Sequence, residues 1–227
     1  MQGKLIVFEG VEGCGKTTQL ELLFNWLQSS LVLQKLKAAS LVADVKKTRQ
    51  PGGTELGVHL RQILLQPQNQ YQVQPAAELL LYAADRAQHV EQLIRPWLEA
   101  GYLVLCDRFT DSTLAYQGYG RGLDLALIEQ LNQIATSGLK SDLTLWLKLD
   151  AKVGLERTHE RGLADRIEQA DLSFHRRVQQ GFAALAQNNT HTIKPIAADR
   201  TQAAIAQQIQ SILQASLSQW YPLPLPP

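Results

Sequence analysis

The stretch FEGVEGCGKTTQ, residues 8–19, decides the fold of this 227-residue chain. Residues 10–17 match the pattern G-x-x-x-x-G-K-S/T, which binds phosphate when a strand precedes it and a helix follows. The apolar run KLIVFE precedes the match, and residues 20–27 follow it with apolar side chains at helical spacing. Glycines let successive backbone N–H groups turn towards one anion, and the helix N-terminus adds partial positive charge. The stretch therefore predicts a nucleotide-binding loop (P-loop).

Each part of this loop has an expected contact with ATP and Mg²⁺. Lys16 is expected to reach the β- and γ-phosphates, and the hydroxyl of Thr17 is expected to ligate Mg²⁺. A second magnesium ligand is Asp107, which ends the buried run LVLCD. The residues expected to bind ATP are Gly10, Val11, Glu12, Gly13, Cys14, Gly15, Lys16, Thr17 and Thr18.

Strands and helices alternate along the rest of the chain. Helical patterns cover residues 20–27, 76–98, 124–137 and 205–220, and residues 28–40 fit either a helix or a loop. This alternation predicts an α/β fold, a parallel sheet with helices on both faces. We expect one domain over residues 1–221 and a frayed Pro-rich tail over 222–227. The expected strands are residues 4–9, 41–48, 102–107, 142–149 and 190–196.

Composition excludes several classes of protein. With 22 basic and 21 acidic residues the net charge is +1, which argues against a surface that coats nucleic acid or an anionic membrane. No apolar run approaches the ~18 residues of a membrane span, and the N-terminus does not resemble a signal peptide. Cys14 and Cys106 are expected to be buried thiols and not a disulfide or metal site. We expect a cytoplasmic protein.

Arginines follow the predicted strands at the edge where open α/β sheets bind ligands. Arg49 and Arg108 come directly after strands, so both should converge on the P-loop. Phosphoryl transfer between two polyanions needs positive charge in a closed pocket. The segment LERTHERGLADRIEQ, residues 155–169, adds Arg157, Arg161 and Arg166 with little apolar periodicity. It predicts a mobile lid that brings an arginine to the triphosphate, and not a packed helix.

Five motifs together resemble the thymidylate (dTMP) kinase family. They are FEGVEGCGKTT, TRQPGGTELG, ELLLYAADRAQHV, CDRFTDSTLAYQGYGRG and RGLADRIEQ, in the order that the family has. The resemblance implies a P-loop kinase fold with a five-stranded parallel sheet and an arginine-rich lid. It also implies transfer of the γ-phosphoryl group of ATP to dTMP with Mg²⁺, giving dTDP, by a homodimer.

The resemblance assigns the acceptor nucleotide to residues outside the P-loop. Tyr82 would stack on thymine, and Arg86, one turn later, would read a base carbonyl. Tyr116 would pack against C2′ of the sugar, where a ribose hydroxyl would collide with it. Thr113 and Gln117 would lie near the base and the sugar.

Further roles implied by the resemblance concern charge. Arg49 and Arg108 would hold the acceptor phosphate, and Glu12 would accept a hydrogen bond from the 3′-hydroxyl. The segment GVEGCG has no arginine, so the chain is similar to the subgroup whose catalytic arginine comes from the lid. Arg161 is the first candidate for that arginine, and Arg157 is the second.

Departures from the family pattern leave alternatives open. Gln50 stands where TREPGG has glutamate, which would loosen a contact to Arg49, and Tyr82 replaces the commoner phenylalanine. One alternative is another P-loop nucleoside or nucleotide kinase, acting on dUMP, CMP or a deoxynucleoside. The other is a P-loop ATPase or switch protein without a small acceptor, which would not need Arg49 and Arg108.

Overall fold

The computed structural model describes residues 3–66, 72–160, 162 and 165–221. Its centre is a five-stranded sheet of order β2-β3-β1-β4-β5 in which all neighbouring strands are parallel. All five expected strands form, although β2 begins four residues later than the sequence pattern indicated. The strands are β1 (Lys4–Glu9), β2 (Val45–Arg49), β3 (Leu103–Asp107), β4 (Leu143–Lys148) and β5 (Ile193–Ala197).

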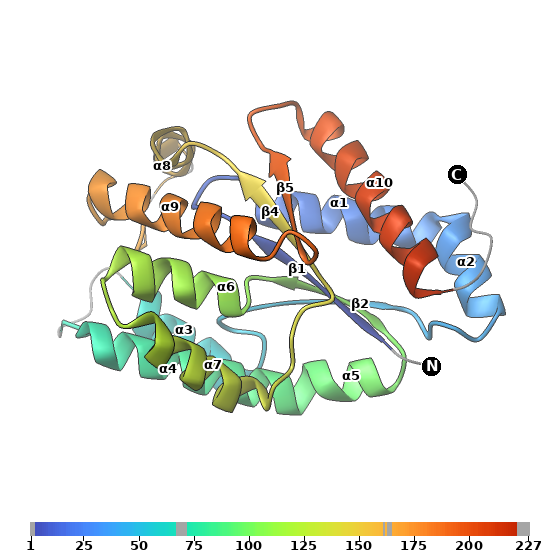
Figure 1. Cartoon of the computed structure of the whole chain (residues 1–227), viewed down its shortest axis with the longest axis horizontal. Helices are drawn as coiled ribbons and strands as arrows, with labels where there is room; N and C mark the ends of the chain where they lie inside the picture. The colour runs from blue at the N-terminus through green and yellow to red at the C-terminus, as the bar shows by residue number, and fades with distance from the viewer. Residues whose placement is uncertain (1–2, 67–71, 161, 163–164, 222–227) are drawn as a thin grey trace.

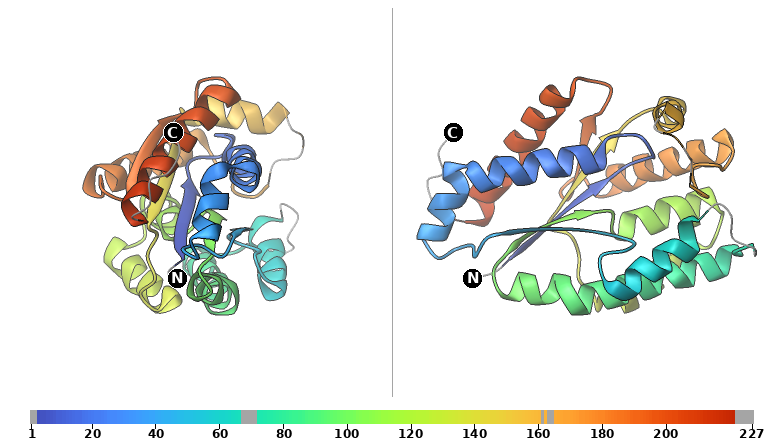
Figure 2. Two further views of the ribbon diagram at one scale, coloured as in Figure 1. Left: turned by 90° about the vertical axis from the view of Figure 1, so that its right-hand side faces the viewer. Right: turned by 180° about the vertical axis from the view of Figure 1, so that it is seen from behind.

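Helices cover both faces of the sheet (Figure 1). Figure 2 shows the same layers from two further sides, with α1, α2 and α10 on one face and α4, α5 and α7 on the other. The helices are α1 (Lys16–Ser29), α2 (Leu31–Ala38), α3 (Glu55–Leu65), α4 (Pro75–His89), α5 (Arg95–Glu99), α6 (Thr110–Thr113), α7 (Leu125–Thr136), α8 (Ala151–Glu160), α9 (Leu172–Asn188) and α10 (Gln202–Trp220). Two π-helical segments, η1 (Val90–Ile94) and η2 (Leu114–Gly120), continue α4 and α6.

Burial of β1 on both faces explains its continuous apolar sequence. Leu5 and Val7 pack in one buried cluster with Val90 and Ile94 of η1. Ile6 and Phe8, which point to the opposite face, belong to a larger cluster that also contains residues of α1 and α10. Successive side chains of a strand alternate between faces, so a strand covered on both sides needs apolar residues throughout.

A helix cap at Ser30 divides the segment 28–40, which the sequence left open between a helix and a loop. The side chain of Ser30 accepts a hydrogen bond from the backbone N–H of Leu33, at 3.1 Å, and starts α2 as a separate helix. Of the two alternatives, helix or loop, the helix is correct, because Val32, Leu33 and Leu36 are buried and give α2 a packing face.

The prediction that residues 155–169 do not form a packed helix was wrong for the first part of the segment. Residues 151–160 form α8, which buries Ala151, Gly154 and Thr158. These small residues recur every three or four positions, so the helix packs closely without the large apolar side chains of an ordinary amphipathic helix. The Pro-rich tail, residues 222–227, lies outside the described residues.

Two expectations from composition can be compared with the structure. Cys14 and Cys106 are buried free thiols, as predicted. Across the described ranges, every helix is too short or too polar to cross a lipid bilayer.

Candidate active site

The P-loop joins β1 to α1, and its lysine is held by the loop itself. Gly15 caps α1 with a φ of 91°, in the left-handed region that glycine adopts without strain. The ammonium group of Lys16 donates to the carbonyl oxygens of Gly10 and Val11, at 3.1 and 2.9 Å. These contacts keep the positive charge of Lys16 at the N-terminus of α1. The helix dipole is positive at the same end, so both charges attract an anion to the loop.

The two predicted magnesium ligands lie side by side. The Thr17 hydroxyl donates to Oδ2 of Asp107 at 2.7 Å, although the residues are 90 positions apart in the chain. Both offer oxygen atoms, which Mg²⁺ prefers, and Mg²⁺ is commonly bound by one or two protein groups together with substrate phosphates. Within the described residues there is no cluster of three or more His, Cys, Asp or Glu that could hold a metal alone. The pair therefore fits a magnesium ion that arrives with a nucleotide.

Two adjoining cavities open at the carboxyl ends of β1, β2 and β3. The larger, of about 790 Å³, is lined by Gly13–Thr18 of the P-loop and by Arg49, Asp107 and Arg157. The narrower, of about 80 Å³, lies beside it and is lined by the other predicted acceptor residues, which are Tyr82, Arg86, Thr113, Tyr116 and Gln117. Five residues line both cavities: Glu12, Gln50, Arg61, Arg108 and Asp165.

Arg108 lies at this boundary in a strained turn. Its φ of 69° is in the left-handed region, which costs a non-glycine residue about 1–2 kcal/mol. The buried carboxylate of Glu9 supports the turn, because it accepts from the backbone N–H of Phe109 at 2.8 Å and from the backbone and hydroxyl of Ser112 at 3.1 and 2.5 Å. Burial, with a smaller contribution from Asp111, raises the pKa of Glu9 to about 7.

The guanidinium of Arg108 connects the P-loop with the narrow pocket. It donates to Glu12 at 2.6 Å, to the Tyr116 hydroxyl at 3.1 Å, and to Ser112 and the Gly10 carbonyl. The Tyr116 hydroxyl also donates to Glu12, at 2.9 Å. Burial alone would raise the pKa of Glu12, but Arg108, followed by Lys16, lowers it to about 2. Glu12 is therefore ionised and held between two donors.

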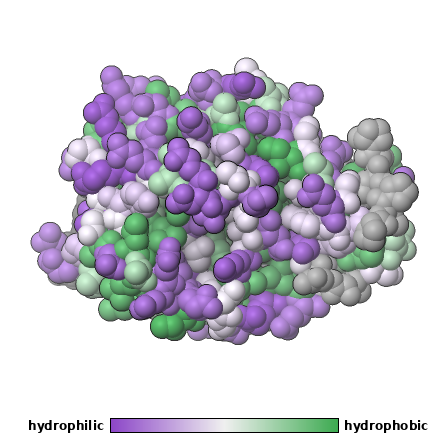
Figure 3. All heavy atoms as spheres, viewed as in Figure 1, coloured by the Kyte–Doolittle hydropathy of each residue, from purple (hydrophilic) through white to green (hydrophobic). Residues whose placement is uncertain are grey.

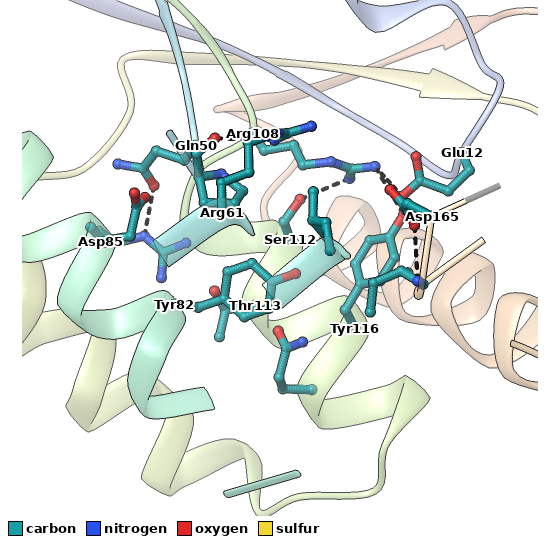
Figure 4. A pocket seen from close by; sticks show the side chains of 15 residues that line it. Glu12, Gln50, Arg61, Tyr82, Asp85, Arg108, Ser112, Thr113, Tyr116 and Asp165 are labelled. Carbon is teal, nitrogen blue, oxygen red and sulfur yellow. Dashed lines mark hydrogen bonds and ion pairs between the residues drawn. The ribbon is translucent and has the colours of Figure 1, made fainter. Parts of the chain in front are cut away.

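The predicted base-binding residues line the narrow pocket. Figure 4 shows Tyr82 and Thr113 on one side of it, with Glu12 at the far end beside Arg108. Arg86 is 2% exposed and donates to the side chain of Asn132 at 2.8 Å and to the Phe109 carbonyl at 2.9 Å. A guanidinium carries five N–H donors, so donors remain for a ligand.

The residue at position 50 was expected to contact Arg49, and this expectation was wrong. The side chain of Gln50 contacts Arg86 and His89, at 3.0 Å each, and not Arg49. The reason is topological: Arg49 ends β2 as an exposed residue, whereas Gln50 turns inward beneath the loop and is 4% exposed. Arg49 lines the larger cavity only.

The arginines of residues 155–169 lie in different places. Arg157 of α8 lines the larger cavity and donates to the Ala198 carbonyl at 3.4 Å, whereas Arg161 lies outside the described residues. Arg166 points elsewhere: it donates to the Leu64 carbonyl at 2.7 Å and forms an ion pair with the buried carboxylate of Glu78. Arg166 thus fastens the end of the segment to α3 and α4.

Helix α8 also touches the P-loop. A Cβ atom at Gly13 would collide with the backbone of Gly154 in α8, and a Cβ atom at Gly154 would collide with the carbonyl oxygen of Glu12. A side chain at either position would have to displace backbone and not merely a flexible side-chain end. The P-loop and α8 are therefore in direct backbone contact.

Comparison with known sequences decides the family. Residues 8–209 match the family described as thymidylate kinase. The chain belongs to the thymidylate kinase family. It is 57% identical to a thymidylate kinase from Cyanothece sp., over 98% of both chains, and 56% identical to one from Trichodesmium erythraeum, over 97% of this chain and 99% of the relative. The crystal structure of thymidylate kinase from Ehrlichia chaffeensis superimposes with a TM-score of 0.71 at 31% identity, covering 94% of this chain and 99% of that one. These matches confirm the family and the fold inferred from the motifs.

Sequence reasoning missed two arginines that line these cavities. Arg61 of α3 lines both cavities and donates to the Pro51 carbonyl at 3.1 Å. Its pKa is lowered by burial and then by the neighbouring charge of Arg49. Arg200, after β5, lines the larger cavity. The sequence offered one signal for Arg61. Thr54 caps α3, because its side chain accepts a hydrogen bond from the backbone N–H of Gly57 at 3.0 Å, and Arg61 lies two helical turns after this cap.

Proposed function

We propose that this chain transfers the γ-phosphoryl group of ATP to dTMP, giving ADP and dTDP. The observation that carries the proposal is the boundary at Arg108, where a phosphate-binding cavity adjoins a narrow pocket with an aromatic wall. Membership of the thymidylate kinase family supports the same acceptor.

On the donor side, the P-loop N–H groups and Lys16 would bind the β- and γ-phosphates. Thr17 and Asp107 would hold Mg²⁺, which neutralises charge as the phosphoryl group moves. Their separation of 2.7 Å supports a shared ion. The remaining ATP-binding residues of the loop, 10–15 and Thr18, would surround the phosphates as backbone donors.

On the acceptor side, the arginine cluster would bind the dTMP phosphate. Arg108 and Arg49 were expected from the sequence, and Arg61 joins them because it lines both cavities. The pKa of Arg61 is lowered first by burial and then by the charge of Arg49, and an anion between the guanidinium groups would relieve this repulsion. Binding the acceptor phosphate there would place it beside the P-loop, as in-line transfer requires.

The nucleoside would occupy the narrow pocket. Tyr82 would stack on thymine, and Arg86 would donate to a base carbonyl. Tyr116 would exclude a 2′-hydroxyl, and Glu12 would accept from the 3′-hydroxyl after releasing one of its present donors. Thr113 and Gln117 would complete the walls.

The lid would supply the remaining charge. Arg161 is our candidate for the arginine that contacts the transferred group, with Arg157 second because it already lines the larger cavity. A catalytic arginine of this kind is worth about 10³–10⁵ in rate. We propose that residues 1–221 form one kinase domain with its lid at about 155–169, acting in the cytoplasm.

We also propose a homodimer formed through α3, α4 and α7. Apolar side chains on these neighbouring helices are exposed, among them Ile134 at 74%, Leu80 at 57% and Leu127 at 49%. Figure 3 shows hydrophobic side chains gathered on the lower left of the surface, towards α7. Light scattering on the purified chain would test this, and a monomer at micromolar concentration would refute it.

The decisive assay is ADP release with purified chain, ATP and Mg²⁺. We expect dTMP to support turnover well above the rate with dUMP, CMP, GMP or no acceptor. Turnover without acceptor would identify an ATPase, and a preference for another monophosphate would identify a different nucleotide kinase. Omitting Mg²⁺ should abolish the dTMP-dependent rate.

A further inference from the structure

Beneath the narrow pocket, a chain of buried polar side chains leads from β2 to Arg86. The Thr48 hydroxyl lies 2.6 Å from Nε2 of His89, and Nδ1 of His89 lies 3.0 Å from the side-chain amide of Gln50. The Gln50 oxygen accepts from Nε of Arg86, at 3.0 Å. Gln50, Arg86 and His89 are 4%, 2% and 0% exposed, so these hydrogen bonds are shielded from bulk water.

The chemistry of the partners fixes the direction of each hydrogen bond from Thr48 to Arg86. Arginine can only donate, so the oxygen of Gln50 must face Arg86 and its NH₂ group must face His89. Nδ1 of His89 therefore carries a lone pair, and the ring proton is on Nε2, where it is donated to Thr48. The ring is neutral: burial, followed by the charge of Arg86, lowers the pKa of His89 to about 4.

The loop over residues 50–53 leaves no room for the ring of His89 to turn. A Cβ atom at Gly53 would collide with the imidazole of His89. The backbone N–H of Gly52 donates to the carboxylate of Asp85, at 2.9 Å, and ties the same loop to α4. The ring of His89 is thus enclosed between β2, the loop over residues 50–53 and its own helix.

The three partners of Arg86 are all neutral. They are the Gln50 oxygen, the Asn132 oxygen and the Phe109 carbonyl, so no carboxylate forms a direct ion pair with this guanidinium among the described residues. A carboxylate at position 50 could still accept from Arg86. It would, however, face the lone pair of His89 unless Nδ1 took up a proton.

We propose that Gln50 and His89 are a matched pair of positioning residues that hold Arg86 towards the acceptor base without a direct ion pair to its guanidinium. Gln50 fixes the guanidinium, and His89, as the Nε2–H tautomer, fixes Gln50. The proposal rests on the proposed function, because it names what orients the residue that reads the base.

The functional test measures thymidine as a competitive inhibitor against dTMP, since thymidine lacks a phosphate and reports on the nucleoside pocket. Removing a hydrogen bond to a charged group in Gln50→Ala should weaken thymidine about tenfold. The KM for ATP should change less than twofold. The matched control is Gln88→Ala, which removes an exposed glutamine of the same helix whose side-chain amide donates to Gln92, and it should leave thymidine binding unchanged.

The structural test is ¹⁵N NMR of the histidine rings, with His89→Asn to assign the signal. Wild type should show the Nε2–H tautomer without titration from pH 5 to 8.5. Gln50→Glu should protonate Nδ1 and give thymidine binding a pH dependence that wild type lacks. An Nδ1–H tautomer in wild type, or unchanged thymidine binding in both Gln50 variants, would overturn the proposal.

These results are separable from failure of the proposed function. If wild type shows no dTMP-dependent ADP release, the function is wrong. If wild type is active and the Gln50 variants match it, only the positioning pair is wrong. Should Gln50→Ala not fold, the near-isosteric Gln50→Glu and the wild-type spectrum still decide.

Discussion

Replacing the P-loop carboxylate in Glu12→Gln should lower the free energy of unfolding by about 3 kcal/mol at pH 7.5. The value follows from the pKa of Glu12, which is about 2 in the folded protein against 4.5 for the unperturbed group, at 1.36 kcal/mol per unit. Loss of a partner from a buried ion pair costs a similar amount, about 3–5 kcal/mol. The pair with Arg108 qualifies as largely buried, since the two side chains are 20% and 16% exposed.

The pH dependence follows from the direction of the shift. A folded-state pKa below the unfolded value means that the stabilisation is complete above about pH 4.5 and is lost as pH falls towards 2. The difference between wild type and Glu12→Gln should therefore narrow by about 1.4 kcal/mol per pH unit below 4.5. Urea titrations followed by tryptophan fluorescence at pH 7.5, 4.5 and 3.5 measure it.

An exposed ion pair provides the control. Glu21 pairs with Lys47 at 2.5 Å, but their side chains are 45% and 40% exposed. Glu21→Gln should cost less than about 1 kcal/mol, because water screens the pair. A loss below 1 kcal/mol for Glu12→Gln, or a loss that does not change with pH, would refute the reasoning.

Three further predictions concern the lid, the sugar and the P-loop. Arg161→Ala should lower kcat about 10³-fold or more with little change in dTMP affinity, as measured by single-turnover kinetics. If kcat stays within a few-fold of wild type, Arg157 and not Arg161 is the catalytic arginine. Tyr116→Ala should improve turnover of the thymine ribonucleotide relative to dTMP by about tenfold, the effect of relieving ~1.4 kcal/mol; competition assays that find unchanged discrimination would exclude the steric role. Gly154→Ala should cost about 1–3 kcal/mol through overpacking and raise the KM for ATP. The control is Val153→Ala, at an exposed position of the same helix. Thermal unfolding measures the stability of both variants, and steady-state kinetics measures their KM for ATP. An unaltered KM in Gly154→Ala would show that the contact between α8 and the P-loop is absent in the working enzyme.

The sequence predicted the parts of the site that depend on local patterns. The P-loop, the strand ends and the pairing of Thr17 with Asp107 follow from motif spacing and the parallel order of strands. Arg61 and Arg200 were missed because the sequence indicates at most where a helix begins, as Thr54 does for α3, and only tertiary packing brings these two arginines to the cavity.

Other misses share the same cause. Gln50 was expected beside Arg49, but neighbours in an extended chain point to opposite sides, and the side chain turned inward. Residues 155–160 lacked apolar periodicity, yet they fold as helix because small residues suffice when two backbones meet. The left-handed turn at Arg108 depends on the distant carboxylate of Glu9, which no local pattern indicates.

The contact between Gly13 and Gly154 constrains how this chain can be altered. Because backbone meets backbone there, a change in the backbone path of the phosphate loop requires a matching change in α8. An engineer who grafts the loop of another nucleotide kinase must graft its partner helix as well, whatever the loop's own sequence. Directed evolution of donor preference in this chain should accordingly accumulate paired changes in residues 10–15 and 151–158, and rarely changes in one segment alone.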